Sequence, residues 1–170
     1  TKKFDLYKKN IINFIDIPED YPLNENQWMQ VNSELNTTTT IDKKKIKEFV
    51  NDLKYPLYFM DFETFATAIP VFNKSKPYQQ LVFQYSLHIL PAANGELQHK
   101  EFLAETNGTD PRIPFIEKLI TDCGTTGDIL VYNIGFERGK LSELALSFPK
   151  YKTPINKIIA RLKDLMIPFQ

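Results

Sequence analysis

The sequence predicts an α/β domain built on one mixed β-sheet, with an arm of helices before it. Three segments with strand character, 57–62, 81–90 and 96–103, follow one another with no helical pattern between them, and helix and strand patterns alternate after them. Consecutive strands pair antiparallel and strands separated by a helix pair in parallel, which together give a mixed sheet. We therefore expect a helical arm over 1–53 and the sheet domain over 54–170.

The arm is predicted to hold three helices, because apolar residues recur in it at helical spacing. The first two groups are Phe4, Tyr7, Ile11, Phe14 and Ile15, and then Trp28, Val31 and Leu35. A third helix follows Asp42, which is a favourable cap residue. Its apolar stripe is Ile46, Phe49, Val50 and Leu53. The lysines of this helix are expected to face water.

The first three strands differ in how deeply they are expected to be buried. Leu57 to Phe62 is a nearly continuous apolar run, which is typical of a central strand buried on both faces. Residues 81–90 alternate between apolar and polar side chains and predict a half-buried strand. The turn at Ala93-Asn94-Gly95 then allows 96–103 to pair with that strand as a hairpin.

Helical stripes and a short strand alternate in the rest of the chain. Asp110-Pro111 begins a helix with the stripe Ile113, Ile116, Leu119, Ile120 and Cys123. Residues 129–132 predict a fourth strand, and the helix after it has the stripe Leu141, Leu144, Ala145 and Phe148. Thr153-Pro154 begins a last helix with the stripe Ile155, Ile158, Ile159, Leu162 and Leu165.

Composition excludes several classes of protein. The 21 basic and 21 acidic residues cancel, so any nucleic-acid site must be local. Cys123 is the only cysteine, which excludes an internal disulfide and a cysteine zinc cage. The chain has no membrane-spanning apolar run and no signal-peptide pattern, so we expect a cytoplasmic protein with no membrane partner. Because it starts at Thr1 and stops on an apolar note, we expect it to be a piece of a longer protein.

Two carboxylates at the end of the first strand are the first candidates for chemistry. Asp61 and Glu63 are two residues apart, so in an extended backbone both point to the same face. Burying two unpaired acids in an apolar strand is unfavourable, and a divalent cation such as Mg²⁺ or Mn²⁺ would offset that cost. The alternative is structural: Asp61 caps a turn and Glu63 pairs with a lysine. Asp-x-Glu alone does not decide between them.

A second candidate, Glu137, follows the fourth strand in Tyr132-Asn133-Ile134-Gly135-Phe136-Glu137. A carboxylate in the first turn of a helix is electrostatically favourable, so Glu137 is also explained as a capping residue. The strand order nevertheless allows the carboxyl ends of the first and fourth strands to lie side by side. Ligands of open α/β sheets bind at such ends. Asp61, Glu63 and Glu137 therefore form one predicted site.

These motifs resemble the DEDD family of 3′-5′ exonucleases over residues 55–165. The resemblance implies a ribonuclease H-like fold and two-metal-ion hydrolysis of DNA or RNA, with Asp61, Glu63 and Glu137 as catalytic metal ligands. Glu137 stands where that family has an aspartate. Asp164 is the best remaining acid for a fourth ligand. The family's third motif, a His or Tyr with an Asp, would lie beyond Gln170.

A closer similarity covers nearly the whole chain. It rests on Tyr55 to Thr64, Pro77-Tyr78-Gln79-Gln80, Phe83-Gln84-Tyr85-Ser86 and Arg161 to Leu165. These segments look like an uncharacterised bacterial family, domain of unknown function 2779. Its members resemble DEDD nucleases and often follow a RecB- or Cas4-like nuclease region, which is implied here as a partner.

Substrate contacts are expected from residues near the two acidic motifs, namely Thr64, Phe65, Tyr78, Gln84, Asn133 and Arg138. Metal-dependent hydrolysis of nucleic acid is the leading hypothesis. The first rival is a degenerate nuclease fold that acts as a binding or scaffolding module beside an active nuclease domain. The second rival is a ribonuclease H-type endonuclease that uses Asp61, Glu63 and a different acid.

Overall fold

The computed structural model describes residues 1–169 and divides the chain into two compact units. The first runs from Thr1 to Lys43, and the second begins at Lys44. The helix α3 (Lys43–Asp52) therefore lies almost wholly in the second unit, whereas we expected it in an arm ending at residue 53. An ion pair of 2.7 Å between Asp52 and Lys163 joins α3 to the sheet.

The first unit contains α1 (Lys2–Lys8), a short 3-10 helix η1 (Phe14–Asp16) and α2 (Glu25–Leu35). The predicted helical stripe from Phe4 to Ile15 is broken, because Asn10 has a left-handed φ of 58°. The Ile11 N–H donates to the Leu6 carbonyl and the Asn10 N–H to that of Tyr7, which is a Schellman ending. At α2, Asn24 and Gln27 form a reciprocal capping box.

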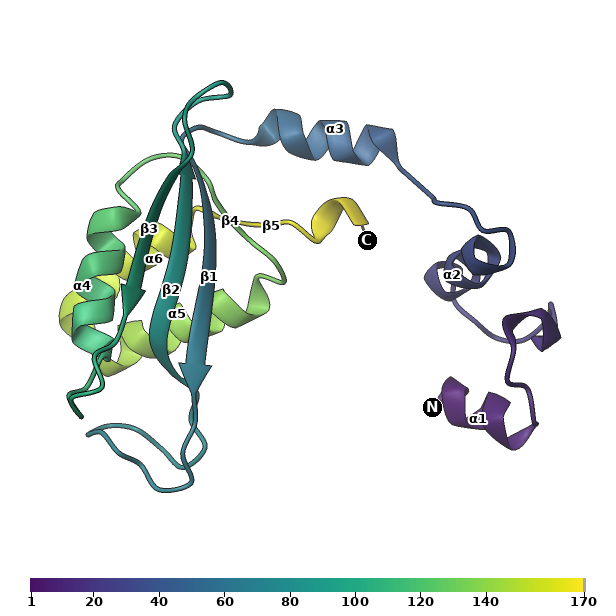
Figure 1. Cartoon of the computed structure of the whole chain (residues 1–170), viewed down its shortest axis with the longest axis horizontal. Helices are drawn as coiled ribbons and strands as arrows, with labels where there is room; N and C mark the ends of the chain where they lie inside the picture. Colours follow the sequence, from purple (N-terminus) through teal and green to yellow (C-terminus); the bar gives the residue numbers. More distant parts are fainter. Residues whose placement is uncertain (170) are drawn as a thin grey trace. The chain divides into compact units, whose positions relative to one another are not determined.

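The second unit is built on a five-stranded sheet in the order β3-β2-β1-β4-β5 (Figure 1). The strands are β1 (Leu57–Phe65), β2 (Leu81–Leu90), β3 (Gln98–Leu103), β4 (Ile129–Val131) and β5 (Leu162–Asp164). The first three pair antiparallel, and β4 pairs in parallel with both β1 and β5. The predicted mixed α/β sheet is confirmed.

Only the first half of β1 is buried on both faces, whereas the sequence predicted burial on both faces along Leu57 to Phe62. Tyr58, Met60 and Phe62 face the core, whereas Asp61 and Glu63 on the opposite face are exposed. The reason is the helix layer, which covers one face. Figure 1 shows α4 (Arg112–Asp122), α5 (Gly135–Ser147) and α6 (Lys152–Ile159) on the same side of the sheet.

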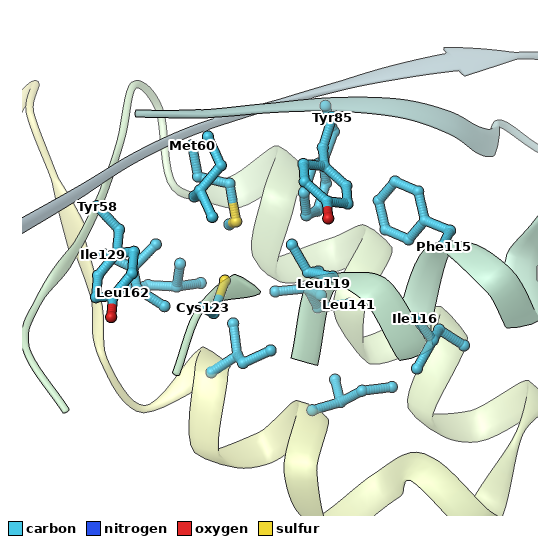
Figure 2. Packing of buried hydrophobic residues seen from close by; sticks show 14 of the residues in the cluster. Tyr58, Met60, Tyr85, Phe115, Ile116, Leu119, Cys123, Ile129, Leu141 and Leu162 are labelled. Atoms are coloured by element: carbon cyan, nitrogen blue, oxygen red, sulfur yellow. The ribbon is translucent and has the colours of Figure 1, made fainter. Parts of the chain in front are cut away.

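The core lies between the sheet and these three helices (Figure 2). Its centre is Phe115, whose ring meets those of Phe62, Tyr85 and Phe102 edge-to-face at 5.2 to 5.6 Å. Cys123 is a free, fully buried thiol in the same cluster. The alternating apolar residues of β2 that the sequence singled out supply Tyr85 and Leu87, both fully buried.

The last predicted helical stripe is wrong beyond Ile159. Leu162 lies in β5, and Leu165 follows that strand. The Ile129 N–H donates to the Arg161 carbonyl, and the Leu165 N–H donates to the Val131 carbonyl. Pairing with β4 therefore overrides the helical spacing of the leucines. A 3-10 helix, η3 (Ile167–Phe169), follows; another, η2 (Pro149–Tyr151), precedes α6.

Arg161 fastens the loop between α4 and β4. Its guanidinium donates to the carbonyls of Cys123, Gly124, Thr126 and Gly127 and lies 5.1 Å from the centroid of the Tyr58 ring. One side chain, located between α6 and β5, thus satisfies four backbone carbonyls of the α4–β4 connection. None of the helices formed by residues 1–169 has the length and apolar character that a membrane span requires.

Replacing Arg161 with Ala is expected to lower the free energy of unfolding by roughly 1.5–3 kcal/mol, the range for charge-assisted hydrogen bonds. Urea denaturation of the two proteins measures the difference. The control is Lys157→Ala, an exposed position on α6, which should change stability by less than about 0.5 kcal/mol. Equal stabilities of Arg161→Ala and Lys157→Ala would contradict a fastening role.

Asp122 is a buried charge at the end of α4. Its carboxylate accepts hydrogen bonds from the Tyr85 hydroxyl at 2.6 Å, from Lys118 at 2.7 Å and from Lys100 at 3.3 Å. Burial opposes the charged form, but these three donors outweigh it and hold the pKa of Asp122 below its ordinary value of 3.8. Burial, and then the hydrogen bond to Asp122, raise the pKa of Tyr85.

Because the folded-state pKa of Asp122 is lowered, its ionised form stabilises the fold above the unfolded pKa, and this contribution is lost as pH falls through the folded pKa. Asp122→Asn is therefore expected to be less stable than the wild type by roughly 1–3 kcal/mol at neutral pH. The difference should shrink as pH falls below about 4. Urea denaturation across that pH range checks it; a difference that stays constant would count against this role.

Candidate functional site

The carboxyl ends of β1 and β4 lie side by side. The two strands pair in parallel, with Tyr58 opposite Ile129 and Phe59 opposite Leu130. Asp61 follows this pairing along β1, and β4 leads into the turn Tyr132-Asn133-Ile134 that starts α5. The expectation that the first and fourth strands bring their ends together is confirmed, because β4 is the direct neighbour of β1.

Asp61 and Glu63 project from the face of β1 that is opposite the helices. Asp61 pairs with Ser86 of β2, and Glu63 pairs with Gln84 just before a register shift in the strand. Both side chains are exposed, so the expected cost of burying two carboxylates in a central strand does not arise here. Within residues 1–169 neither side chain accepts a hydrogen bond or forms an ion pair. Asp61 therefore does not cap a turn and Glu63 does not pair with a lysine, which were the structural roles considered for them.

The buried carboxylate of the site is Glu137. It lies in the first turn of α5 and is only 3% exposed. Its Oε2 atom has no hydrogen-bond partner among the described residues. Glu137 shares its helix face with the fully buried Leu141, so the helix that packs on the core also holds the carboxylate out of solvent.

Electrostatics disfavour the charged form of Glu137. Burial raises its pKa above the ordinary 4.5, its own backbone N–H partly offsets this, and the charges of Asp61 and Asp164 raise it further. The nearest buried cation on the same helix, Lys140, pairs with Glu143 at 2.9 Å instead. Glu137 is therefore a buried carboxylate beside two further negative charges, and the cation close to these acids, Arg138, acts on Asp164 and is not among the charges that shift the pKa of Glu137.

Asp164 ends β5 and lies on the other side of β4. Its Oδ1 accepts from the N–H groups of Asn133 at 3.0 Å and Met166 at 2.9 Å, and its Oδ2 accepts from that of Ile134 at 3.1 Å. Burial opposes ionisation, but these donors and the nearby Arg138 lower the pKa of Asp164. Asp164 is thus ionised and already engaged by the backbone.

No three His, Cys, Asp or Glu side chains converge as a ready-made metal cage in the part of the chain that the structure describes. Mg²⁺ does not require one, because it usually binds one or two carboxylates and keeps water or substrate phosphate in its other positions. Glu137, with an unpartnered buried oxygen beside the charge of Asp61, fits such a cation.

Three of the predicted substrate residues lie on β1 or β2 near the acidic pair, and their positions differ: Gln84, Thr64 and Phe65. Gln84 lies directly opposite Glu63, so the structure brings these two together. The register shift after Glu63 places Thr64 opposite the core residue Val82. Phe65 is half-buried and meets the rings of Phe72 and Phe83 edge-to-face at 6.3 and 6.1 Å. Gln84 thus lies beside the acidic pair, whereas Phe65 packs in a cluster of three rings at the end of β1.

The remaining predicted substrate residues lie in loops or at the start of α5. Tyr78 is 74% exposed, and its left-handed backbone, with φ of 57°, is held by a hydrogen bond of 2.8 Å to the Thr67 carbonyl. Asn133 is exposed with φ of 64°. Arg138, also exposed, is the residue after Glu137 and acts electrostatically on Asp164.

Sequence reasoning assigned the burial to the wrong acids. The signal that identifies Glu137 is helical spacing: residues 137, 141, 144 and 145 form one stripe, and all four are buried. The apolar spacing alone gives three members of that stripe, Leu141, Leu144 and Ala145. Nothing in the sequence indicated that Arg112 is buried: this side chain is 2% exposed, and its guanidinium donates hydrogen bonds to both carboxylate oxygens of Asp110.

Comparisons with known proteins give relatives of unknown function. The chain is 31% identical over 131 residues to an uncharacterized protein MG366 homolog of Mycoplasma pneumoniae and 30% identical to uncharacterized protein MG366 of Mycoplasma genitalium. The aligned part is 71% of this chain and 19% of each relative, so the chain spans about a fifth of the length of these proteins. No solved structure matches it. The family described as domain of unknown function (DUF2779) matches residues 58–170, which include nearly the whole sheet and all three helices that cover it, and the chain therefore belongs to the DUF2779 family.

Proposed function

We propose that this domain hydrolyses phosphodiester bonds of nucleic acid with the help of Mg²⁺ or Mn²⁺. The observation that carries the proposal is Glu137: a carboxylate that is 3% exposed, has one oxygen without a partner among the described residues, and lies within the electrostatic reach of Asp61 and Asp164. A divalent cation is the group that would offset such a charge.

The sheet supports the proposal. Three antiparallel strands, β1 to β3, are followed by helix, strand, helix, helix and a fifth strand, in the arrangement that the resemblance to DEDD exonucleases implies. We propose the ribonuclease H-like topology for this sheet on that basis. Asp61 of β1 and Glu137 after β4 then stand at neighbouring strand ends, where open α/β sheets bind ligands.

Each residue of the site has a distinct part in this proposal. Asp61 and Glu137 hold the cation, which would polarise the scissile phosphate and activate water. Glu63 presents a second exposed carboxylate on the same face of β1, where it can orient water or bind a further cation. Gln84, opposite Glu63, offers an amide that can donate to a sugar or base, and Phe65 offers a ring face for base stacking.

One observation favours a second candidate function, a binding or scaffolding module without turnover. No ready-made cage of three metal-binding side chains exists within residues 1–169. In the relatives the aligned part is 19% of the polypeptide, which leaves room for a partner nuclease region of the RecB or Cas4 type. Isothermal titration with Mg²⁺ and Mn²⁺ separates the candidates, because a scaffold does not require the cation.

Asp61→Asn is expected to reduce Mg²⁺-dependent hydrolysis of single- or double-stranded DNA or RNA by roughly a hundredfold or more, the loss typical of removing transition-state stabilisation. Glu137→Gln should have an effect of the same order. The assay follows release of labelled nucleotides by the full natural polypeptide, with any partner nuclease centre inactivated. Circular substrates distinguish exonuclease from endonuclease products.

The matched control for that assay is Glu101→Gln. Glu101 is an exposed acid on β3 in the same row of the sheet as Asp61, two strands away through Ser86. It should leave hydrolysis unchanged. The proposal fails if the wild type has no metal-dependent activity on any of these substrates, or if Asp61→Asn retains it.

Glu137 also predicts how the cation acts on stability. Its folded-state pKa is raised, so in the metal-free protein the contribution of this group to stability is fully present below pH 4.5 and is lost as pH rises through the folded pKa. At neutral pH Mg²⁺ should raise the melting temperature of the wild type. Glu137→Gln should melt higher than the wild type without metal and should gain little from Mg²⁺.

Differential scanning fluorimetry at neutral pH measures these shifts. Glu143→Gln is the control on the same helix, because Glu143 pairs with Lys140 and is not part of the site; its response to Mg²⁺ should match that of the wild type. An equal Mg²⁺ response in Glu137→Gln and the wild type would show that Glu137 does not bind the ion.

A further inference from the structure

We infer that Asp164 is a positioning residue, which holds the turn that presents Glu137, and not a ligand of the cation. The inference rests on the proposed function and concerns how its site is built. The observations behind it are the three backbone hydrogen bonds that the Asp164 carboxylate accepts from Asn133, Ile134 and Met166.

The geometry places Asp164 across the start of α5. Val131 at the end of β4 lies opposite Asp164 in the parallel pairing, so its carboxylate reaches the two residues that come just before the helix. Ile134 is the N-cap of α5, and its side chain makes no capping hydrogen bond. Asp164 therefore supplies, from the neighbouring strand, an acceptor for the N–H of the N-cap residue Ile134, which in a capping box would come from the side chain at the third helical position.

The turn that Asp164 holds contains a residue in the left-handed region. Asn133 adopts φ of 64°, a left-handed conformation that non-glycine residues rarely occupy without compensation. Its N–H donates to Asp164 at 3.0 Å, and its carbonyl accepts from the Phe136 N–H at 3.2 Å. This turn sets the direction in which α5 leaves the sheet. Glu137, three residues after Ile134, is carried with it into its buried place.

The count of lone pairs argues against direct metal binding by Asp164. A carboxylate has about four acceptor sites, and three of those of Asp164 are taken by backbone N–H groups. The one remaining site lies on Oδ2, so Asp164 has a single position to offer a cation, and a cation there would compete with the Ile134 N–H for the same oxygen. Glu137, by contrast, has an oxygen with no partner among the described residues.

A double-mutant cycle over Asp164 and Asn133 tests the inference. Asp164→Ala is expected to weaken Mn²⁺ binding, measured by isothermal titration without substrate, by roughly tenfold to a hundredfold, the usual effect of losing a supporting group. Asn133→Gly should restore part of that loss in the double variant, because glycine adopts the left-handed conformation without strain. A direct ligand of the ion would give no such rescue.

Amide hydrogen exchange gives a readout that does not depend on the metal. In the wild type the N–H groups of Asn133 and Ile134 should be protected, and in Asp164→Ala they should exchange faster while the core of β1 stays protected. Asp164→Asn retains one acceptor oxygen and should fall between the two, which keeps the test open if Asp164→Ala does not fold.

The outcomes separate the two proposals. A wild type that binds no Mn²⁺ overturns the proposed function. A wild type that binds Mn²⁺ overturns the inference alone if Asp164→Ala binds as tightly, or if its loss of binding is unchanged by Asn133→Gly. Loss of amide protection at Asn133 and Ile134 together with rescue by Asn133→Gly establishes the positioning role.

Discussion

The parallel pairing of β4 between β1 and β5 is the constraint on which the candidate site depends. Three acids that act on one another come from these strands or from the helix that follows one of them: Asp61 from β1, Glu137 from α5 after β4, and Asp164 from β5. These residues are far apart in the sequence. They act on one another electrostatically only because parallel strands end at the same edge of the sheet.

The helix layer gives these acids different environments. It covers the face of the sheet that carries Tyr58, Met60 and Phe62 and leaves Asp61 and Glu63 on the opposite face in solvent. Glu137 belongs to the helix layer and is carried into the interior with Leu141. The difference in solvation gives the acids different tendencies to ionise, because water stabilises the charge of an exposed carboxylate and cannot reach a buried one.

Several parts of the fold were readable from local patterns. The alternating residues of 81–90 and the apolar stripe of α4 reflect burial on one face, so β2 and α4 appeared where they were expected. Other parts depended on long-range contacts. Leu162 and Leu165 continue a helical stripe in the sequence, but residues 162–164 pair in parallel with β4 and form a strand instead. Asn10 ends α1 because its backbone turns left-handed, which apolar spacing does not reveal.

The sequence by itself determined the order of strands and helices as far as α6, the mixed sheet and the acidic motifs at Asp61, Glu63 and Glu137, because these depend on spacing and residue type along the chain. Only the tertiary structure decided which acid is buried, which acids lie close to one another, and that Asp164 is engaged by the backbone of the β4–α5 turn. Burial and electrostatic contact depend on what packs against a residue from elsewhere in the chain, and a local pattern carries no information about that neighbour.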